Sequence, residues 1–325
     1  MKKTILPIDW LTALLRSLPA RAIHILLSLL TLLPMATAGA EEAAVKEETP
    51  VAEETGVMEK MEQISALDRR IEVERKTRYQ PFVLSPHKPN YILPISYNDK
   101  PNNAPLNNGP DEELDNYEIK YQFSLKFPLI ENLFGEENSF YFAYTHLSFW
   151  QAYDFGGSSP FRETNHEPEV FVVFPYELNL LGLKNRLIQL GLVHQSNGLS
   201  GDQSRSWNRF YADFILQRGN FYLSVKPWYH IQGEGSDRDN PDIENYLGHG
   251  EFRFAYADTE HTLTMMLRNN AHNHNYGAVE IDWSFPMSRR ARWLIQYFNG
   301  YGESLIDYNA RTHRLGIGVA FTDWL

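Results

Sequence analysis

The feature that most constrains the fold is a series of segments, each about ten residues long, in which apolar residues alternate with polar or small ones. These segments follow one another from about Pro89 to the C-terminus and are separated by turns rich in Gly, Asn, Asp and Pro. Because successive side chains of a β-strand point to opposite faces, each segment predicts a strand with one apolar face. Such a series is typical of a transmembrane β-barrel.

We expect twelve strands. Their approximate ranges are 89–97, 116–127, 139–151, 166–175, 186–196, 207–217, 220–231, 243–256, 261–270, 276–285, 292–301 and 312–323. An even number places both chain ends on one side, and closure leaves no free sheet edge in lipid. We therefore predict an all-β fold, a twelve-stranded antiparallel transmembrane β-barrel over residues 81–325. A soluble β-sandwich or a lipocalin-like barrel stays open as the alternative reading of the pattern alone.

The last of these segments shows the alternation most clearly. Leu315, Ile317, Val319 and Phe321 alternate with small or polar residues, so one face is apolar. The chain also contains 7 Trp, 18 Tyr and 19 Phe, many of them near segment ends. Aromatic side chains in these places are typical of the two belts at the boundary between lipid and water.

The N-terminal region has the order of a secretory signal. Basic residues at positions 2, 3, 16 and 21 precede the apolar run 23–33, and small residues follow at 36–40. We predict a signal peptide over residues 1–40, cleaved near residue 38 or 40. A membrane anchor is the alternative, but a helix needs about 20 apolar residues to span a bilayer and this run is shorter.

Residues 41–80 form an acidic region that we expect to be a solvated, mobile extension. Residues 41–62 carry eight acidic side chains against Lys46 and Lys60, which is −6 of the chain's net charge of −11. Within residues 58–75, the apolar spacing also suits a short amphipathic helix, so helix and linker both stay open. The acidic balance argues against a nucleic-acid partner, because nucleic-acid binding requires a basic surface.

Three polar residues lie on the apolar faces of two neighbouring predicted strands. His194 and Ser196 are in phase with Leu192, and Asn208 is in phase with Phe210. If these two strands form a hairpin, residues whose numbers have a constant sum lie opposite each other. His194 then faces Asn208, on the side of the wall that would contact lipid.

These three residues suit a hydrolytic triad. A serine hydroxyl becomes a nucleophile when a base removes its proton and a third group orients that base. Ser196, His194 and Asn208 can fill these roles, and Asn208 would orient the imidazole without bringing a charge to an apolar surface. Backbone amides near Ser196 and Gly198, or a bound cation, would stabilise the oxyanion. The alternative is that the pair at the strand end merely caps a loop, because His-x-Ser is a common spacing.

Longer blocks of sequence around these residues resemble the outer-membrane phospholipase A family. The blocks are residues 158–165, 194–198, 204–209, 225–229, 239–242 and 300–309, and the resemblance runs from about residue 81 to 325. It implies a barrel in the outer membrane of Gram-negative bacteria that hydrolyses acyl esters of phospholipids and lysophospholipids, with both A1 and A2 specificity. It also implies dependence on calcium and an active homodimer. Ser196 corresponds to the nucleophile, His194 to the general base and acid, and Asn208 to the residue that orients His194.

The resemblance further implies a Ca²⁺ site between two subunits. Ser204 and the backbone carbonyl of Leu199 correspond to ligands from one subunit, and Ser158 to a ligand from the other. The family pattern has arginine where this chain has Leu199, but any residue supplies a carbonyl oxygen. The positive charge of the arginine is absent here.

Two further positions depart from the family pattern. Asp239 resembles a residue of a second calcium site, but its partner position is Gly201, with Asp202 adjacent. His146 stands where the family often has an interface glutamine, so it bonds the other subunit or is an ordinary barrel histidine.

Two other classes of protein stay open. A non-enzymatic barrel, either a pore or a structural protein, would conduct ions or lack hydrolysis. A soluble secreted esterase with a β-sandwich would remain in the aqueous phase without detergent.

Overall fold

A closed β-barrel forms most of the chain that the computed structural model describes. The described residues are 65–77, 80, 83–104, 113–134, 138–154, 159–180, 182–231 and 239–324. The predicted signal segment 1–40 and residues 41–64 of the acidic region lie outside them.

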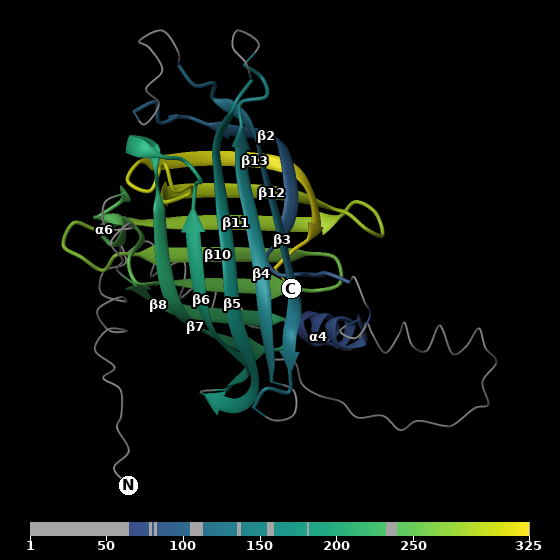
Figure 1. Ribbon diagram of the computed structural model, residues 1–325. Coiled ribbons are helices and arrows are strands. Elements are labelled where there is room, and N and C mark those ends of the chain that lie inside the picture. The colour runs from purple at the N-terminus through teal and green to yellow at the C-terminus, as the bar shows by residue number, and fades with distance from the viewer. Residues whose placement is uncertain are drawn as a thin grey trace, which may run out of the picture. The chain divides into compact units, whose positions relative to one another are not determined.

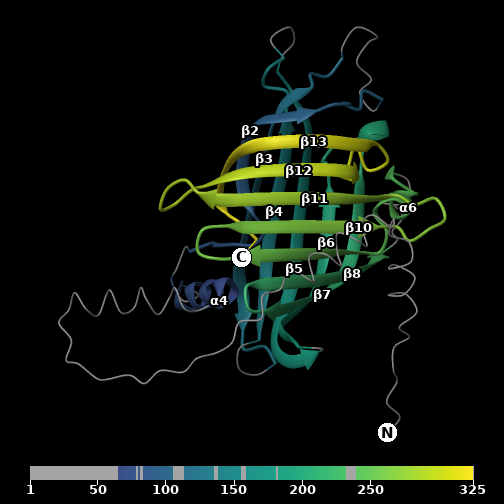
Figure 2. The ribbon, with the colours of Figure 1, turned by 180° about the vertical axis from the view of Figure 1, so that it is seen from behind.

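Twelve antiparallel strands make the barrel wall, which Figures 1 and 2 show from opposite sides. They are β2 (Asn90–Asn98), β3 (Tyr117–Glu131), β4 (Ser139–Trp150), β5 (Phe161–Leu180), β6 (Leu183–Ser196), β7 (Ser206–Arg218), β8 (Phe221–Ile231), β9 (Gly250–Ala257), β10 (Thr262–Asn269), β11 (Gly277–Pro286), β12 (Arg292–Tyr301) and β13 (Arg311–Thr322). Each strand pairs with its neighbours in the chain, and β13 pairs with β2 to close the ring. The two-residue strand β1 (Ser85–Pro86) pairs with β3. The predicted fold is confirmed.

Two strands, β9 and β5, differ most from their predicted ranges. Residues 243–247, expected to begin a strand, form the short helix α6 (Ile243–Leu247), and β9 begins only at Gly250. Ile243 and Leu247 are both buried and are four residues apart, which is the spacing of one helix face. Strand β5 is longer than expected at both ends, because polar residues occupy both of its faces near its start and hide the alternation.

The two faces of the wall differ in polarity. On β3, Phe123 and Leu125 are exposed on the outside, whereas Glu118, Lys120 and Ser124 are buried on the inside. On β13, Leu315 and Ile317 point outward with almost half of their surface exposed. This arrangement reverses that of a soluble barrel and suits a surface surrounded by hydrocarbon.

Ion pairs neutralise the charged groups inside the barrel. Glu118 accepts hydrogen bonds from Arg162 at 3.1 Å and is paired with Arg314 at 2.7 Å. Glu303, from the connection between β12 and β13, pairs with Arg314 at 2.8 Å and with Lys120 at 2.9 Å. Because a buried charge is costly unless it is paired, this network lets charged side chains fill the barrel.

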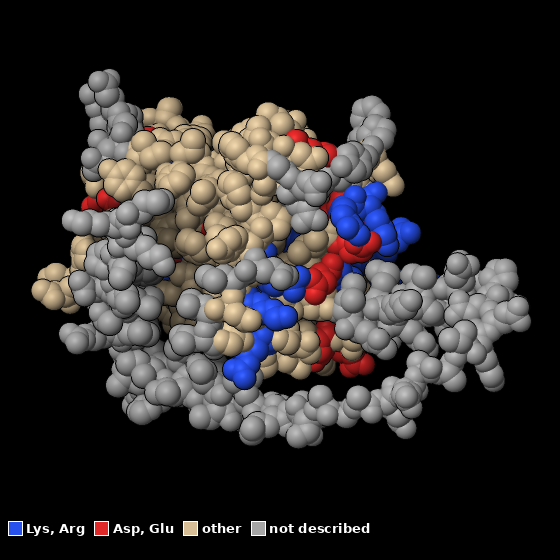
Figure 3. All heavy atoms as spheres, turned by 90° about the horizontal axis from the view of Figure 1, so that it is seen from below, with Lys and Arg blue, Asp and Glu red and all other residues tan. Residues whose placement is uncertain are grey.

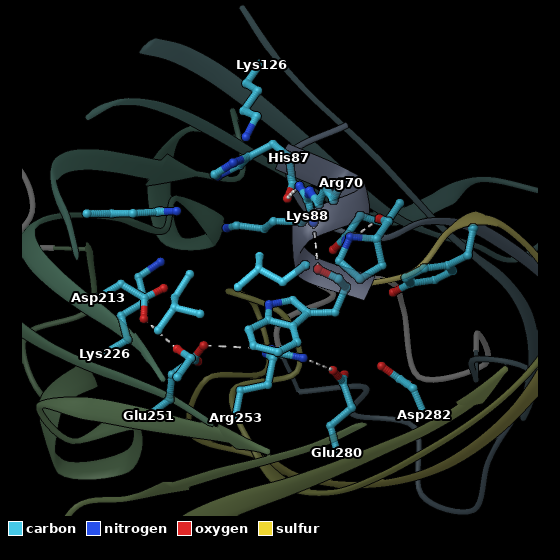
Figure 4. A pocket seen from close by; sticks show the side chains of 18 of the residues that line it. Arg70, His87, Lys88, Lys126, Asp213, Lys226, Glu251, Arg253, Glu280 and Asp282 are labelled. Atoms are coloured by element: carbon cyan, nitrogen blue, oxygen red, sulfur yellow. Dashed lines mark hydrogen bonds and ion pairs between the residues drawn. The ribbon is translucent and has the colours of Figure 1, made fainter. Parts of the chain in front are cut away.

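A cavity of about 190 Å³ remains in the interior. Figure 4 shows that charged side chains of both signs line it, among them Asp213, Lys226, Glu251, Arg253 and Glu280. Arg70, on helix α4 (Ala66–Thr77), borders the same cavity. Apolar side chains, among them Leu67 and Ile215, line the cavity beside these charged groups.

Helix α4 lies in the region where the sequence left helix and linker open. Ser65 begins it by accepting a hydrogen bond from the backbone N–H of Asp68 at 3.1 Å. The Arg70 guanidinium donates to the carbonyl of Trp324 at 2.6 Å, and Lys126 of β3 pairs with Glu74 at 2.9 Å. Leu67 is buried among apolar side chains of the barrel interior. These contacts hold α4 against the barrel.

Acidic and basic atoms lie side by side on the face seen from below, as Figure 3 shows. On α4, Glu72 pairs with Arg75 at 2.7 Å and Arg70 with Glu74 at 3.1 Å.

Within the described ranges, no helix is both long and apolar enough to cross a bilayer.

The packing of Leu67 generates a stability prediction. Leu67 is 4% exposed, whereas Val73 on the same helix is 48% exposed. We expect Leu67→Ala to lower the free energy of unfolding by about 2–4 kcal/mol, because it leaves a cavity among packed side chains. We expect Val73→Ala to change it by less than about 0.5 kcal/mol. Urea unfolding of the detergent-folded protein measures both, and equal stability of the two variants would contradict the docking of α4.

Candidate active site

Strands β6 and β7 bring His194 and Asn208 together on the outer wall. The two residues are direct cross-strand partners, as the constant-sum pairing predicted. The imidazole Nδ1–H of His194 donates to Oδ1 of Asn208 at 2.9 Å. This bond leaves Nε2 of the neutral ring as the nitrogen that can accept a proton.

The surroundings of this pair are apolar. The next outward pair along the same two strands is Leu192 with Phe210, and these side chains are 49% and 45% exposed. The intervening residues Val193 and Arg209 belong to the inward phase, and Val193 is buried. His194 and Asn208 therefore lie on the face that carries the apolar belt, at its margin.

Ser196 occupies the last position of β6, two residues beyond His194 and on the same face. Its cross-strand partners are Ser206 on β7 and His166 on β5. In the described part of the chain, Ser196 and His194 are not joined by a hydrogen bond. Hydrogen bonds between a nucleophile and its base are often long before substrate binds and tighten in the complex. The sequence thus predicted that the three residues lie together. The structure contains one of the two hydrogen bonds of a triad, the one from His194 to Asn208.

Asn197 shapes the loop that follows Ser196. Its side chain is 4% exposed, and its Oδ1 accepts the backbone N–H groups of Leu199 at 3.3 Å and Arg205 at 3.0 Å. Its Nδ2 donates to the carbonyl of Gln203 at 2.9 Å and to the Glu163 carboxylate at 3.4 Å. Two donors and two acceptors are all that a side-chain amide offers. One buried side chain therefore ties both ends of loop 197–205 together beside the serine.

The residues predicted to bind calcium are only partly within the described chain. Ser158 lies outside the described residues. Leu199 is an exposed residue of loop 197–205. Ser204 donates its hydroxyl to Oδ2 of Asp239 at 2.7 Å, and Ser206 donates to the same oxygen at 3.3 Å.

The donor atoms at this point fit a hard cation. A carboxylate oxygen and two hydroxyl oxygens converge at Asp239, and oxygen donors of this kind are those that Ca²⁺ prefers. Among the described residues, here as elsewhere, no group of three or more His, Cys, Asp or Glu side chains has metal-binding geometry. The sequence predicted Asp239 only for a second calcium site, near Gly201 and Asp202. In the structure, the Asp239 carboxylate accepts hydrogen bonds from Ser204 and Ser206.

His146 lies on β4 in the same phase as Tyr144, whose side chain is exposed on the outer wall. Its Nε2 lies 3.0 Å from the hydroxyl of Ser148, and its ring stacks on Tyr121 with centroids 5.8 Å apart. A hydrogen bond from His146 to a second subunit stays a prediction.

Sequence reasoning missed His166. It lies on the outer face of β5, paired with Ser196 on one side and with His146 on the other. Its Nδ1 is 2.6 Å from the hydroxyl of Tyr144, and its ring centroid is 5.3 Å from that of His146. The constant-sum pairing that found His194 and Asn208, applied to the hairpin before it, would have found His166 as well.

Comparison with known proteins gives a family for this arrangement. The family model for phospholipase A1 matches residues 67–321. Phospholipase A1 of Salmonella typhimurium is 39% identical over 243 residues, which are 75% of this chain and 83% of that protein. Phospholipase A1 of Escherichia coli K12 is 37% identical over 243 residues with the same coverage.

Solved structures agree with this family. Outer membrane phospholipase A from Escherichia coli aligns with a TM-score of 0.72 and 36% identity, covering 76% of this chain and 95% of that one. The outer membrane phospholipase dimer of Salmonella typhi, solved with bound calcium, gives the same TM-score, identity and coverage.

The hydrogen bonds of Asn197 predict how loop 197–205 responds to its removal. We expect Asn197→Ala to raise hydrogen–deuterium exchange in this loop by about tenfold or more, because two backbone N–H groups lose their acceptor. Ser200→Ala is the matched control, since Ser200 is exposed and its side chain makes no capping bond. Mass spectrometry of peptides from the loop measures both variants. Unchanged exchange in Asn197→Ala would show that other contacts order the loop.

Proposed function

Because this chain belongs to the phospholipase A1 family and is a barrel of the outer membrane, we propose that it is a calcium-dependent phospholipase with a Ser-His-Asn triad. Family membership already makes it a lipolytic hydrolase. The proposal adds that it cleaves acyl esters of phospholipids and lysophospholipids at both positions, as an A1 and A2 enzyme. The observation that carries the proposal is the hydrogen bond between His194 and Asn208 on the lipid-facing wall, with Ser196 two residues beyond His194 on the same face.

The chemistry follows from the positions of the three side chains. Asn208 accepts a hydrogen bond from the Nδ1–H group of His194 and so fixes the tautomer whose Nε2 is a base. His194 takes the proton of Ser196 as the hydroxyl oxygen attacks the ester carbonyl, and an oxyanion forms. His194 then protonates the leaving alcohol, which departs as lysophospholipid. A water molecule, deprotonated by His194, hydrolyses the acyl-serine and restores the enzyme.

The location of the site explains how the enzyme reaches its substrate. Lipid esters lie at the margin of the hydrocarbon layer, and His194 and Asn208 lie at the margin of the apolar belt. Loop 197–205 is longer than the turn at residues 219–220 at the other end of β7. In bacterial barrels the longer loops face the outside and the short turns face the periplasm. The site would therefore act on lipid of the outer leaflet.

Calcium and a second subunit would complete the site. Ser204, the Leu199 carbonyl and Ser158 of a second subunit are the proposed ligands, and Asp239 lies within hydrogen-bonding distance of Ser204. A divalent cation at this place would supply positive charge that stabilises the oxyanion. The dimer of the Salmonella typhi relative, with its bound calcium, supports a homodimer as the active form.

We also propose the domain division that the sequence indicated. Residues 1–40 would act as a signal peptide, cleaved near residue 38 or 40, and residues 41–80 as an acidic extension that includes α4. Residues 81–325 would form the catalytic barrel.

The triad and the metal generate the first activity prediction. We expect the purified, detergent-folded protein to release fatty acid from mixed phospholipid micelles with Ca²⁺ and to lose this activity with excess chelator. Ser196→Ala should reduce the rate by at least about a thousandfold, because the nucleophile is lost. Hydrolysis that survives chelation would reject the calcium site but keep the triad. A folded dimer without hydrolysis would favour a non-enzymatic barrel, and full activity of Ser196→Ala would overturn the triad.

The role of Asn208 gives a second activity prediction. We expect Asn208→Ala to lower kcat by about tenfold or more with little change in KM, because the imidazole loses its orientation. In a Ser196→Ala background the same change should have no further effect, since residues that act as one unit are not additive. Fatty-acid release by the two single variants and the double variant measures this. Additive losses would show that Asn208 acts on folding rather than through His194.

A further inference from the structure

A row of polar side chains crosses the outer wall at the height of Ser196. His166 on β5 is the cross-strand partner of Ser196 on β6, and His146 on β4 is the partner of His166. The three side chains therefore lie on neighbouring strands at one level, in the outward phase. The triad uses only one of them, Ser196.

These two histidines need an explanation because of where they stand. Outward positions of a membrane barrel are normally apolar, and a polar group there loses water without compensation. On the strands nearby, Leu192, Phe210 and Phe123 occupy outward positions and are exposed. An imidazole beside the nucleophile therefore needs a polar partner for each of its two ring nitrogens.

The contacts of His166 leave one nitrogen available. Its Nδ1 lies 2.6 Å from the Tyr144 hydroxyl, and with this hydroxyl donating, the neutral ring carries its hydrogen on Nε2. A Cβ atom placed on Gly198 would lie 3.7 Å from Nε2, so this edge of the ring faces the loop that follows Ser196. Among the described residues, Nε2 has no hydrogen-bond acceptor. The Nε2–H group is thus directed toward loop 197–205, which begins directly after Ser196.

The spacing matches the chemistry of a glycerophospholipid. Side chains of paired residues on adjacent strands are about 5 Å apart at Cβ. The phosphodiester is attached to the same glycerol that carries the acyl esters, so it lies only a few bonds from the carbonyl that Ser196 attacks. With the ester at Ser196, the phosphate can reach the neighbouring strand. Oxygen atoms of a phosphodiester are strong hydrogen-bond acceptors.

We propose that His166, oriented by Tyr144, donates a hydrogen bond from Nε2 to the phosphate of the substrate lipid and so favours phospholipids over neutral acyl esters. His146 packs against the ring of His166 and closes the far side of this subsite. This inference rests on the proposed function, because it places the phosphate relative to Ser196. His166 is a specificity residue, and the triad is complete without it.

The test compares two esters that differ only in the head group. Dioctanoyl phosphatidylcholine and dioctanoylglycerol are presented in the same detergent micelles to the wild type, His166→Phe and His166→Gln. We expect His166→Phe to lower kcat/KM for the phospholipid by about tenfold, the effect of one lost hydrogen bond to a charged group. Hydrolysis of the neutral ester should change by less than about twofold. His166→Gln keeps an N–H donor and should recover part of the loss.

Two more variants separate orientation from general effects on the wall. Tyr144→Phe removes the hydroxyl that holds the ring and should lower phospholipid selectivity less than His166→Phe does. His313→Phe is the control, because His313 is an exposed histidine on β13 that bonds Asp99 and lies away from β5 and β6. This variant should hydrolyse both esters as the wild type does.

The outcomes divide clearly. Equal losses for both esters in His166→Phe, or no loss for either, would overturn the phosphate subsite. Inhibition of the wild type by inorganic phosphate that disappears in His166→Phe, together with an unchanged kcat/KM for the phospholipid in that variant, would assign the site to free phosphate and overturn the lipid assignment. If the wild type hydrolyses neither ester, the proposed function fails instead.

Discussion

The closed ladder of backbone hydrogen bonds is the constraint on which the rest of this structure depends. Hydrocarbon offers no partner to a backbone N–H or C=O group, so a sheet that spans it must close. Here β13 pairs with β2 and completes a ring in which every strand has two neighbours. Closure fixes the register of each strand against the next, and the register in turn fixes which side chains share a level on the outer wall.

Closure also separates two environments. The outer face contacts lipid, and it carries exposed apolar residues such as Leu315 and Ile317. The inner face carries charged residues that must neutralise one another, as Glu118 does with Arg162 and Arg314. The same wall can therefore hold an apolar belt outside and an ionic network inside, because a strand sends alternate side chains to opposite faces. A polar residue outside is an exception that indicates function.

The candidate active site is such an exception, and it depends on register rather than on a pocket. His194 and Asn208 meet because β6 and β7 are joined as a hairpin, and Ser196 meets His166 because β5 and β6 are. The interior cavity plays no part in this chemistry and is lined by charged groups of both signs. The substrate would approach from the membrane along the wall, while Asn197 holds the loop behind the nucleophile.

The sequence by itself determined the class of fold, the number of strands and the pairing of His194 with Asn208. All three follow from local alternation and from the arithmetic of a hairpin, which need no knowledge of distant contacts. The sequence could not determine that residues 243–247 form α6, that α4 packs against the barrel through Leu67, or that Asp239 lies beside Ser204. These features depend on segments far apart in the chain, and only the closed barrel brings them together.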